Sequence, residues 1–198
     1  PEEHHHHHIL KIIKRPEVLA TLVVCFLMQV SHGPYYTFFT IYMEEYGYSR
    51  SLIGQLWALG VIAEVGVFLI MHRLVLRLGL RSLLLIALAL TTLRWVLISL
   101  FPEWFGMILF AQTLHAASFG IFHAAAIALF HQFFTGKHQG RGQALYSSIS
   151  FGAGGAVGSL VSGYLWEQWG GGSTYMVAAV ASSLAFIISW IWIRTGNA

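Results

Sequence analysis

Long apolar runs alternate with short polar breaks along this chain. Six runs are long enough to supply the roughly 20 apolar residues that a helix needs to cross about 30 Å of hydrocarbon. They lie near residues 18–42, 52–76, 82–101, 104–134, 144–166 and 175–193. Glycine, charged residues and other turn formers gather in the breaks, as in "MEEYGYSRS", "RLGLR" and "TGKHQGRGQ". The pattern predicts six membrane-spanning helices joined by short loops.

The composition supports a membrane protein over a soluble one. Hydrophobic residues make up 57% of the chain and charged residues only 10%, whereas soluble domains carry about 25% charged residues. A soluble protein with so apolar a core would need a polar shell that these residues cannot supply. We therefore expect an all-α membrane protein, in which residues 17–198 form a six-helix transmembrane bundle.

Residues 1–16 form a polar and basic segment that ends at Pro16. Five successive histidines at positions 4–8 could bind a metal or belong to a tag. We interpret the whole segment as an ordinary hydrophilic connection on the cytoplasmic side. The single cysteine, Cys25, excludes a disulfide within the chain. No metal site and no cofactor is predicted.

Basic residues are distributed unevenly between the two sides of the predicted bundle. Nine of the eleven lie on the side of the termini, one lies on the other side, and one lies inside a span. The nine are Lys11, Lys14, Arg15, Arg73, Arg77, Arg81, Lys137, Arg141 and Arg194. Because cytoplasmic loops carry the excess of Lys and Arg, both termini are predicted to be cytoplasmic.

The first run contains "QVSHGPYYTFF", where Gly33 and Pro34 interrupt the helix near its middle. Proline lacks the backbone donor that would bond the carbonyl one turn earlier, so a kink or hinge is expected. Gln29, His32 and Tyr36 fall on one side of a helix with this spacing. The run thus predicts a polar stripe along a kinked helix.

The fifth run, "YSSISFGAGGAVGSLVSGY", is rich in small residues. Gly154 and Gly158 form a GxxxG pair, which lets a second helix backbone approach closely. We expect them to pack against another helix, although a lipid-facing position without consequence is the alternative.

Two opposite charges lie deep inside predicted spans. Glu64 is in the middle of the second run and Arg94 is in the middle of the third, each roughly a dozen residues from the turn between them. Charged groups at such depth are costly and usually face a bundle interior or an aqueous cavity. We expect the two to form an ion pair, which is either a static packing device or part of a working polar cavity. A lone arginine that reaches a membrane surface is the third interpretation.

The fourth run adds polar groups at comparable depth. Gln112, His115 and His123 share one side of a helix with Phe119 and Phe122. Histidine can exchange protons at physiological pH, so this face is typical of a proton relay or a ligand-binding wall. The histidines are eight residues apart, which is too far for joint metal coordination from one helix. An enzyme is therefore not predicted.

Several segments resemble one known family. "SHGPYYTFFTIY", "GYSRSLIGQLWALGVIAEV" and "RGQALYSS" resemble the C-terminal half of the phenylpropionate permeases. These belong to the major facilitator superfamily and are related to the lactose permease group. "RLGLR" resembles the superfamily's basic loop motif, and Arg94 and His115 fall where lactose permeases place their proton-coupling arginine and histidine. Ser118 stands where those permeases have a glutamate, and their second-span acid is displaced by about one turn from Glu64.

The resemblance implies a function and a partner. It implies one half of a secondary transporter, with proton-coupled symport of a small organic solute such as an aromatic carboxylate. The N-terminal six-helix half, or a second copy, would pack against it in a bacterial inner membrane. No nucleic-acid partner is expected. The alternative is a half-size structural or assembly subunit without transport of its own.

Overall fold

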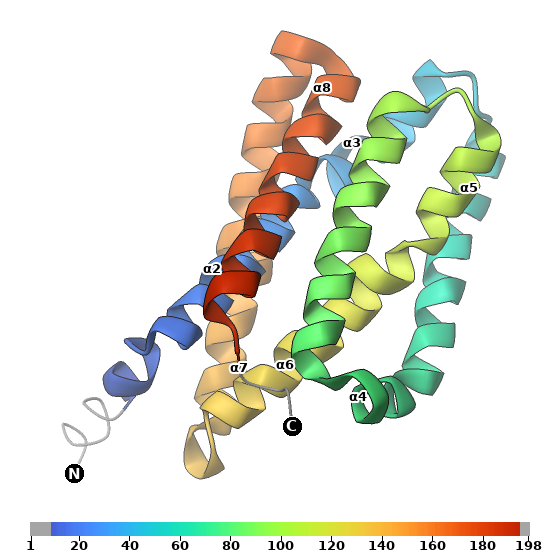
Figure 1. Cartoon of the computed structure of the whole chain (residues 1–198). Coiled ribbons are helices and arrows are strands. Elements are labelled where there is room, and N and C mark those ends of the chain that lie inside the picture. Colours follow the sequence, from blue (N-terminus) through green and yellow to red (C-terminus); the bar gives the residue numbers. More distant parts are fainter. Residues whose placement is uncertain (1–8, 195–198) are drawn as a thin grey trace.

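The computed structural model describes residues 9–194, which are almost entirely helical (Figure 1). The first part of the fold comprises α2 (Pro16–Ser31), α3 (Gly33–Glu45), α4 (Arg50–Leu100), α5 (Phe105–Thr113) and a π-helix, η1 (Ala116–Ile121). The second part comprises α6 (Phe122–Phe133), a 3₁₀ turn η2 (Gly136–His138), α7 (Gln139–Ser147), a second π-helix η3 (Ser148–Gly154) and α8 (Gly155–Trp192). No strand occurs among the described residues, so the predicted all-α class is confirmed. The histidine run at 4–8 lies outside the described residues.

Four continuous helical stretches are long and apolar enough to cross a membrane. They are Pro16–Glu45, Arg50–Leu100, Phe105–Phe133 and Gly136–Trp192. Four stretches stand where six separate helices were predicted, because the two longest reverse direction without an intervening loop (Figure 1). Each reversal lies at a glycine with a left-handed backbone, Gly79 (φ 76°) in α4 and Gly170 (φ 79°) in α8. Glycine tolerates this conformation because it has no Cβ. Both α4 and α8 therefore consist of two antiparallel arms.

The first stretch is divided at His32, between α2 and α3. Pro34 occupies the first turn of α3, where its missing backbone donor costs least. The break lies at the "HGP" sequence.

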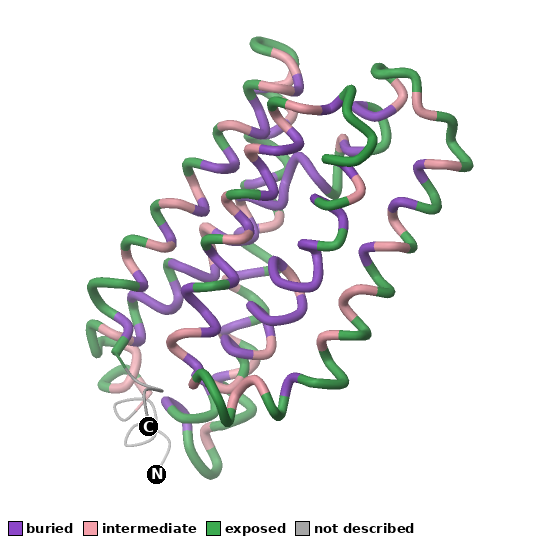
Figure 2. Tube along the Cα trace, turned by 45° about the vertical axis from the view of Figure 1, so that its right-hand side comes forward, coloured by how far each residue is buried: buried purple, intermediate pink, exposed green. Residues whose placement is uncertain are grey.

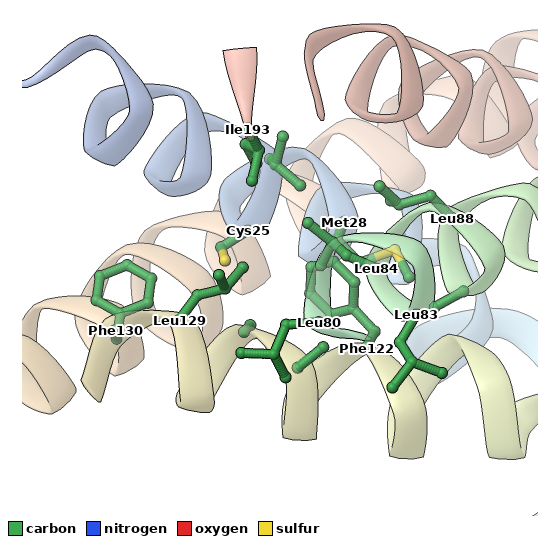
Figure 3. Packing of buried hydrophobic residues seen from close by; sticks show 14 of the residues in the cluster. Cys25, Met28, Leu80, Leu83, Leu84, Leu88, Phe122, Leu129, Phe130 and Ile193 are labelled. Carbon is green, nitrogen blue, oxygen red and sulfur yellow. The ribbon is translucent and has the colours of Figure 1, made fainter. Parts of the chain in front are cut away.

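Two apolar clusters fill the bundle. One gathers residues including Cys25, Met28, Leu84, Phe122 and Leu129, which converge between helices in Figure 3. The other is built around aromatic side chains, including Tyr35, Phe39, Tyr42, Trp95 and Tyr175. Burial is concentrated on the inward sides of the helices, and their outer sides are exposed (Figure 2).

The exposed surface is itself strongly apolar. Leu69, Leu76 and Leu160 are each more than 70% exposed, on the outer sides of α4 and α8. Large apolar patches of this kind are rare on soluble monomers and suit contact with lipid or with another protein. Together with the long apolar helices, they indicate a multi-pass membrane protein.

Buried polar side chains separate the two apolar clusters along three of the helical stretches. We call this set the polar layer; it comprises Gln29, His32, Thr91, Arg94, Gln112, His115 and Ser118. All are at most 6% exposed. Buried polar groups are costly unless they are hydrogen-bonded, and inside membrane helices they usually serve a function. The polar layer is therefore the candidate functional site.

Candidate functional site

Arg94 is the centre of the polar layer and is fully buried. Its Nη1 donates to Ser118 Oγ over 2.7 Å and lies 3.2 Å from Nδ1 of His115. Its Nη2 donates to Oε1 of Gln112 over 3.2 Å. The second arm of α4 therefore presents Arg94 to three polar side chains from the α5–η1 segment.

Aromatic rings surround the same guanidinium. Its central carbon lies 4.0 Å from the Tyr35 ring centroid and 4.8 Å from that of Trp95. Aromatic faces attract cations, and more strongly when water is excluded. Gln112 Nε2 donates to the Tyr35 hydroxyl over 3.1 Å and to the Leu56 carbonyl over 2.9 Å, which fixes its amide toward Arg94.

His115 connects Arg94 to the buried acid. Its Nε2 lies 3.1 Å from Oε2 of Glu64, on the first arm of α4. Arginine can only donate, so Nδ1 accepts from Arg94, and Nε2 carries the proton donated to the Glu64 carboxylate. The side chain of Glu64 is 16% exposed and that of His115 is 7% exposed. Glu64 is therefore the member of this chain of contacts that opens furthest to the outside.

The expected direct ion pair between Glu64 and Arg94 is not formed. Within residues 9–194 no carboxylate lies within 4.0 Å of Arg94, and the His115 ring stands between the two charges. The reason is geometric, because His115, on the third helical stretch, lies between Glu64 and Arg94 on the two arms of α4. The charges are thus linked through an imidazole that both can polarise.

His123 belongs to a second buried polar group. Its Nδ1 is hydrogen-bonded to the Tyr146 hydroxyl, and its Nε2 lies 3.5 Å from the Gln29 amide nitrogen. Phe119 separates this group from the first, with ring centroids 5.4 Å from His115 and 4.5 Å from His123. The two histidines lie on one side of the helix, as their spacing predicted, but each has its own partners.

The stripe on α2 and α3 is divided between two environments. Gln29 and His32 are buried, whereas Tyr36 is 49% exposed. His32 Nδ1 bonds the Met28 carbonyl over 2.8 Å, and its Nε2 is buried without a hydrogen-bond partner among the described residues. Tyr36 instead borders a cavity between α3 and α8.

The two π-helices lie at the two polar groups. η1 begins directly after His115 and contains Ser118 and Phe119, while η3 follows Tyr146 closely and contains Phe151. Such wide turns are uncommon and often occur at functional sites. Sequence reasoning missed them, because no residue pattern in the apolar runs marks a change in hydrogen-bond register.

Other contributors were also missed from the sequence. Tyr35 and Tyr146 occur in apolar runs, where a tyrosine is usually interpreted as an interfacial or core residue. Ser118 was noticed only as a departure from the lactose permeases, yet it makes the shortest contact to Arg94. Its position three residues after His115 on the same helix was the available signal.

Glycines bring the first stretch against the start of α8. A Cβ built at Gly33 would lie 2.3 Å from the carbonyl oxygen of Gly158, and one built at Gly158 would lie 2.9 Å from that of Val30. One built at Gly154 would lie 2.9 Å from the Cβ of Gln29. Only glycine fits these contacts, and the close approach sets the position of Gln29 beside His123.

The described residues contain no group of three His, Cys or acidic side chains close enough to hold a metal ion. Arg94 instead bonds Gln112, His115 and Ser118 within the layer, in an arrangement suited to holding and passing protons and to exchanging ionic partners.

Comparison with known proteins places the chain in a family. The MFS_1 like family matches residues 2–177. The "Probable 3-phenylpropionic acid transporter" of Escherichia coli (strain K12) is 33% identical over 165 residues, covering 81% of this chain and 42% of that protein. The "Maltose permease" of Geobacillus stearothermophilus is 26% identical over 153 residues, covering 77% of this chain and 38% of that protein. The chain thus spans about two fifths of the length of the curated relatives it matches. It belongs to the MFS_1 like family of major facilitator proteins and is similar to the phenylpropionate permeases.

Proposed function

We propose that this chain forms one six-span half of a secondary transporter that couples the movement of a small organic solute to protons. An aromatic carboxylate is the solute class we favour. The observation that carries the proposal is the buried series Glu64–His115–Arg94, an acid, an imidazole and a guanidinium in contact within apolar helices. Ionisable groups inside membrane spans mark proton relays and substrate pathways.

The contacts suggest how a proton and an anion would be coupled. With Glu64 ionised, its negative charge balances Arg94 through the neutral His115 ring. A proton that reaches Glu64 removes this charge, while the guanidinium remains positive. Arg94 then favours a new anionic partner, and the carboxylate of the solute would supply it. Proton and solute would therefore bind together.

The proposed transporter also has a defined number of spans, a second wall and an orientation in the membrane. The four arms of α4 and α8, together with the stretches Pro16–Glu45 and Phe105–Phe133, make six spans. An N-terminal half or a second copy would supply the other wall, because substrate sites of such folds lie between the repeats near the midplane. In the proposed transporter both ends lie on the cytoplasmic side of a bacterial inner membrane, and the excess of basic residues on that side supports this orientation. In support, the backbone nitrogen of Arg194 lies 2.9 Å from a carboxylate oxygen of Glu17, so both described ends lie at one end of the bundle.

Transport in proteoliposomes tests the proposal. The complete transporter, reconstituted with an inward proton gradient, should accumulate 3-phenylpropionate against its concentration gradient. Glu64→Gln, which mimics the protonated acid, should abolish this accumulation yet leave exchange of labelled for unlabelled solute measurable. Glu103→Gln, at an exposed position after α4, serves as the matched control and should behave as wild type. Normal accumulation by Glu64→Gln would remove Glu64 from the proton path, and no flux of any kind would favour an assembly subunit.

A further inference from the structure

A cavity of about 260 Å³ lies between the first helical stretch and the start of α8. It is separate from the enclosed surroundings of Arg94. Its lining residues are Gln29, Gly33, Tyr36, Phe151, Gly155 and Ser159. They come from helices that the glycine contacts hold together, so the shape of the cavity is built into the fold.

Two aromatic side chains border the cavity, and a second ring supports each of them. Tyr36 is 49% exposed and Phe151 is 48% exposed. The Tyr36 ring stacks on His32 at 5.8 Å with planes 25° apart, and the Phe151 ring stacks on His123 at 4.9 Å with planes 19° apart. Rings held in this way lose little freedom when a ligand arrives, which favours binding.

Glycine provides the space between these rings. Gly33 is fixed by its contact with the Gly158 carbonyl. At Gly155, in contrast, a Cβ would meet no atom within 4 Å, so a larger side chain there would extend into open space. Gly155 is therefore not required by packing, and its missing side chain leaves room inside the cavity.

The polar groups of the lining are few and neutral. They are the Gln29 amide, the Ser159 hydroxyl and the Tyr36 phenol, and no acid, lysine or arginine contributes. A sugar ring would need partners for many hydroxyl groups, whereas a flat aromatic ring needs apolar faces and offers its own for stacking. The cavity suits an uncharged ring better than a charged group.

We propose that this cavity seats the aromatic ring of the transported solute between Tyr36 and Phe151, with its charged end outside the cavity. The inference rests on the proposed transport function and adds a ring-recognition site to it. Gln29 lines the cavity and also reaches His123, so an occupied ring site would contact the second polar group through one amide.

Equilibrium binding to the purified complete transporter tests the site. The probes are 3-phenylpropionate, its saturated analogue 3-cyclohexylpropionate, and maltose. Wild type should bind the aromatic acid at least about tenfold more tightly than the saturated one, which corresponds to the worth of one or two ring pairs. Gly155→Val should weaken binding of the aromatic acid about tenfold or more by filling the cavity.

Gly163→Val is the matched control. Gly163 lies two helical turns further along α8, has the same open space at its Cβ position and does not line the cavity. The affinity of the Gly163→Val variant for 3-phenylpropionate should therefore stay within twofold of the wild-type value. Should Gly155→Val fail to elute as a single folded species, Phe151→Leu replaces it, with the same loss expected.

Each result decides the question. Equal affinity of the Gly155 and Gly163 variants, equal binding of the saturated and aromatic acids, tighter binding of maltose, or no binding of 3-phenylpropionate by wild type would each overturn the ring site. Proton-driven uptake that persists in those cases would leave the transport function standing. Ring binding that depends on Gly155, without proton-driven uptake, would instead support the site and refute the transport function.

Discussion

Nδ1 of His115 accepts a hydrogen bond from Nη1 of Arg94 across 3.2 Å. This contact holds only while Nδ1 carries no proton, because a second N–H would face the guanidinium donor. The state of the imidazole and the position of Arg94 are therefore linked. A proton that enters the series must either stop at Glu64 or force Arg94 away from His115.

Two substitutions of Arg94 should distinguish the contribution of its positive charge from that of its planar shape. Arg94→Ala removes the hydrogen bonds to Ser118, His115 and Gln112 and should lower the free energy of unfolding by about 1–3 kcal/mol for each buried partner left unpaired, with loss of uptake. Arg94→Lys keeps the charge but not the planar fork, so it should fold and retain weak uptake at best. Thermal unfolding in detergent and solute uptake measure the two effects. Arg50→Lys, at a side chain 88% exposed, is the control, and full uptake by Arg94→Lys would contradict a need for the fork.

Two glycines should respond to alanine with opposite signs. Gly33→Ala forces a methyl group against the Gly158 carbonyl and should destabilise the protein by about 1–3 kcal/mol. Gly163→Ala meets open space within a helix and should stabilise it by about 0.5–1 kcal/mol. Thermal unfolding of the two variants side by side checks this, and a stable Gly33→Ala would show that the contact between α3 and α8 can relax.

Arg81 should hold the last turn of α8. It donates to the carbonyls of Ile193 over 2.7 Å and Trp190 over 3.0 Å, and its guanidinium carbon lies 5.0 Å from the Trp190 ring centroid. Without these charged donors, as in Arg81→Gln, the turn should open more often. Hydrogen exchange at residues 190–193 should become roughly tenfold faster. Arg77→Gln, at an exposed position in the same segment, should leave the exchange rates unchanged.

Surface labelling should distinguish the two sides of the bundle. Cys25 is fully buried, so the chain offers a silent background for single cysteines. We expect Glu103→Cys to react with an impermeant maleimide from outside intact cells, and Arg141→Cys to react only after the cells are opened. Reaction of both from the same side would refute the proposed topology.

Much of the fold follows from the pattern of apolar runs. Their lengths predict membrane helices, and the breaks between runs at "RLGLR" and between residues 166 and 175 predict the turns that Gly79 and Gly170 make. The sharpness of those turns was not predictable, because a single glycine with positive φ can reverse the chain without a loop. The hydropathy pattern shows where an apolar run ends, but it does not give the backbone angle of the glycine at the turn.

The ionisable residues of the candidate site could be picked out from the sequence, but the contacts among them could not. Glu64, Arg94 and His115 stand out because each is an ionisable group within a long apolar run. The order of contact among them depends on how the α5–η1 segment is rotated against α4, which no single helix encodes. For the same reason, Tyr146 could not be assigned to His123, since its partner lies on another helix.

The π-helix η1 makes the length of the chain between the two histidines part of the site. A π turn accommodates one residue more than an α turn, and one residue corresponds to about 100° of helical rotation. Deletion of a single residue within Ala116–Ile121 would still leave a run long enough to cross a membrane. It would convert the π turn into an α turn, so His123 would keep its side of the helix while the side chains inside the turn, Ser118 among them, change direction. In the evolution of this chain, a one-residue deletion here would therefore alter the contact of Ser118 with Arg94 rather than the placement of either histidine.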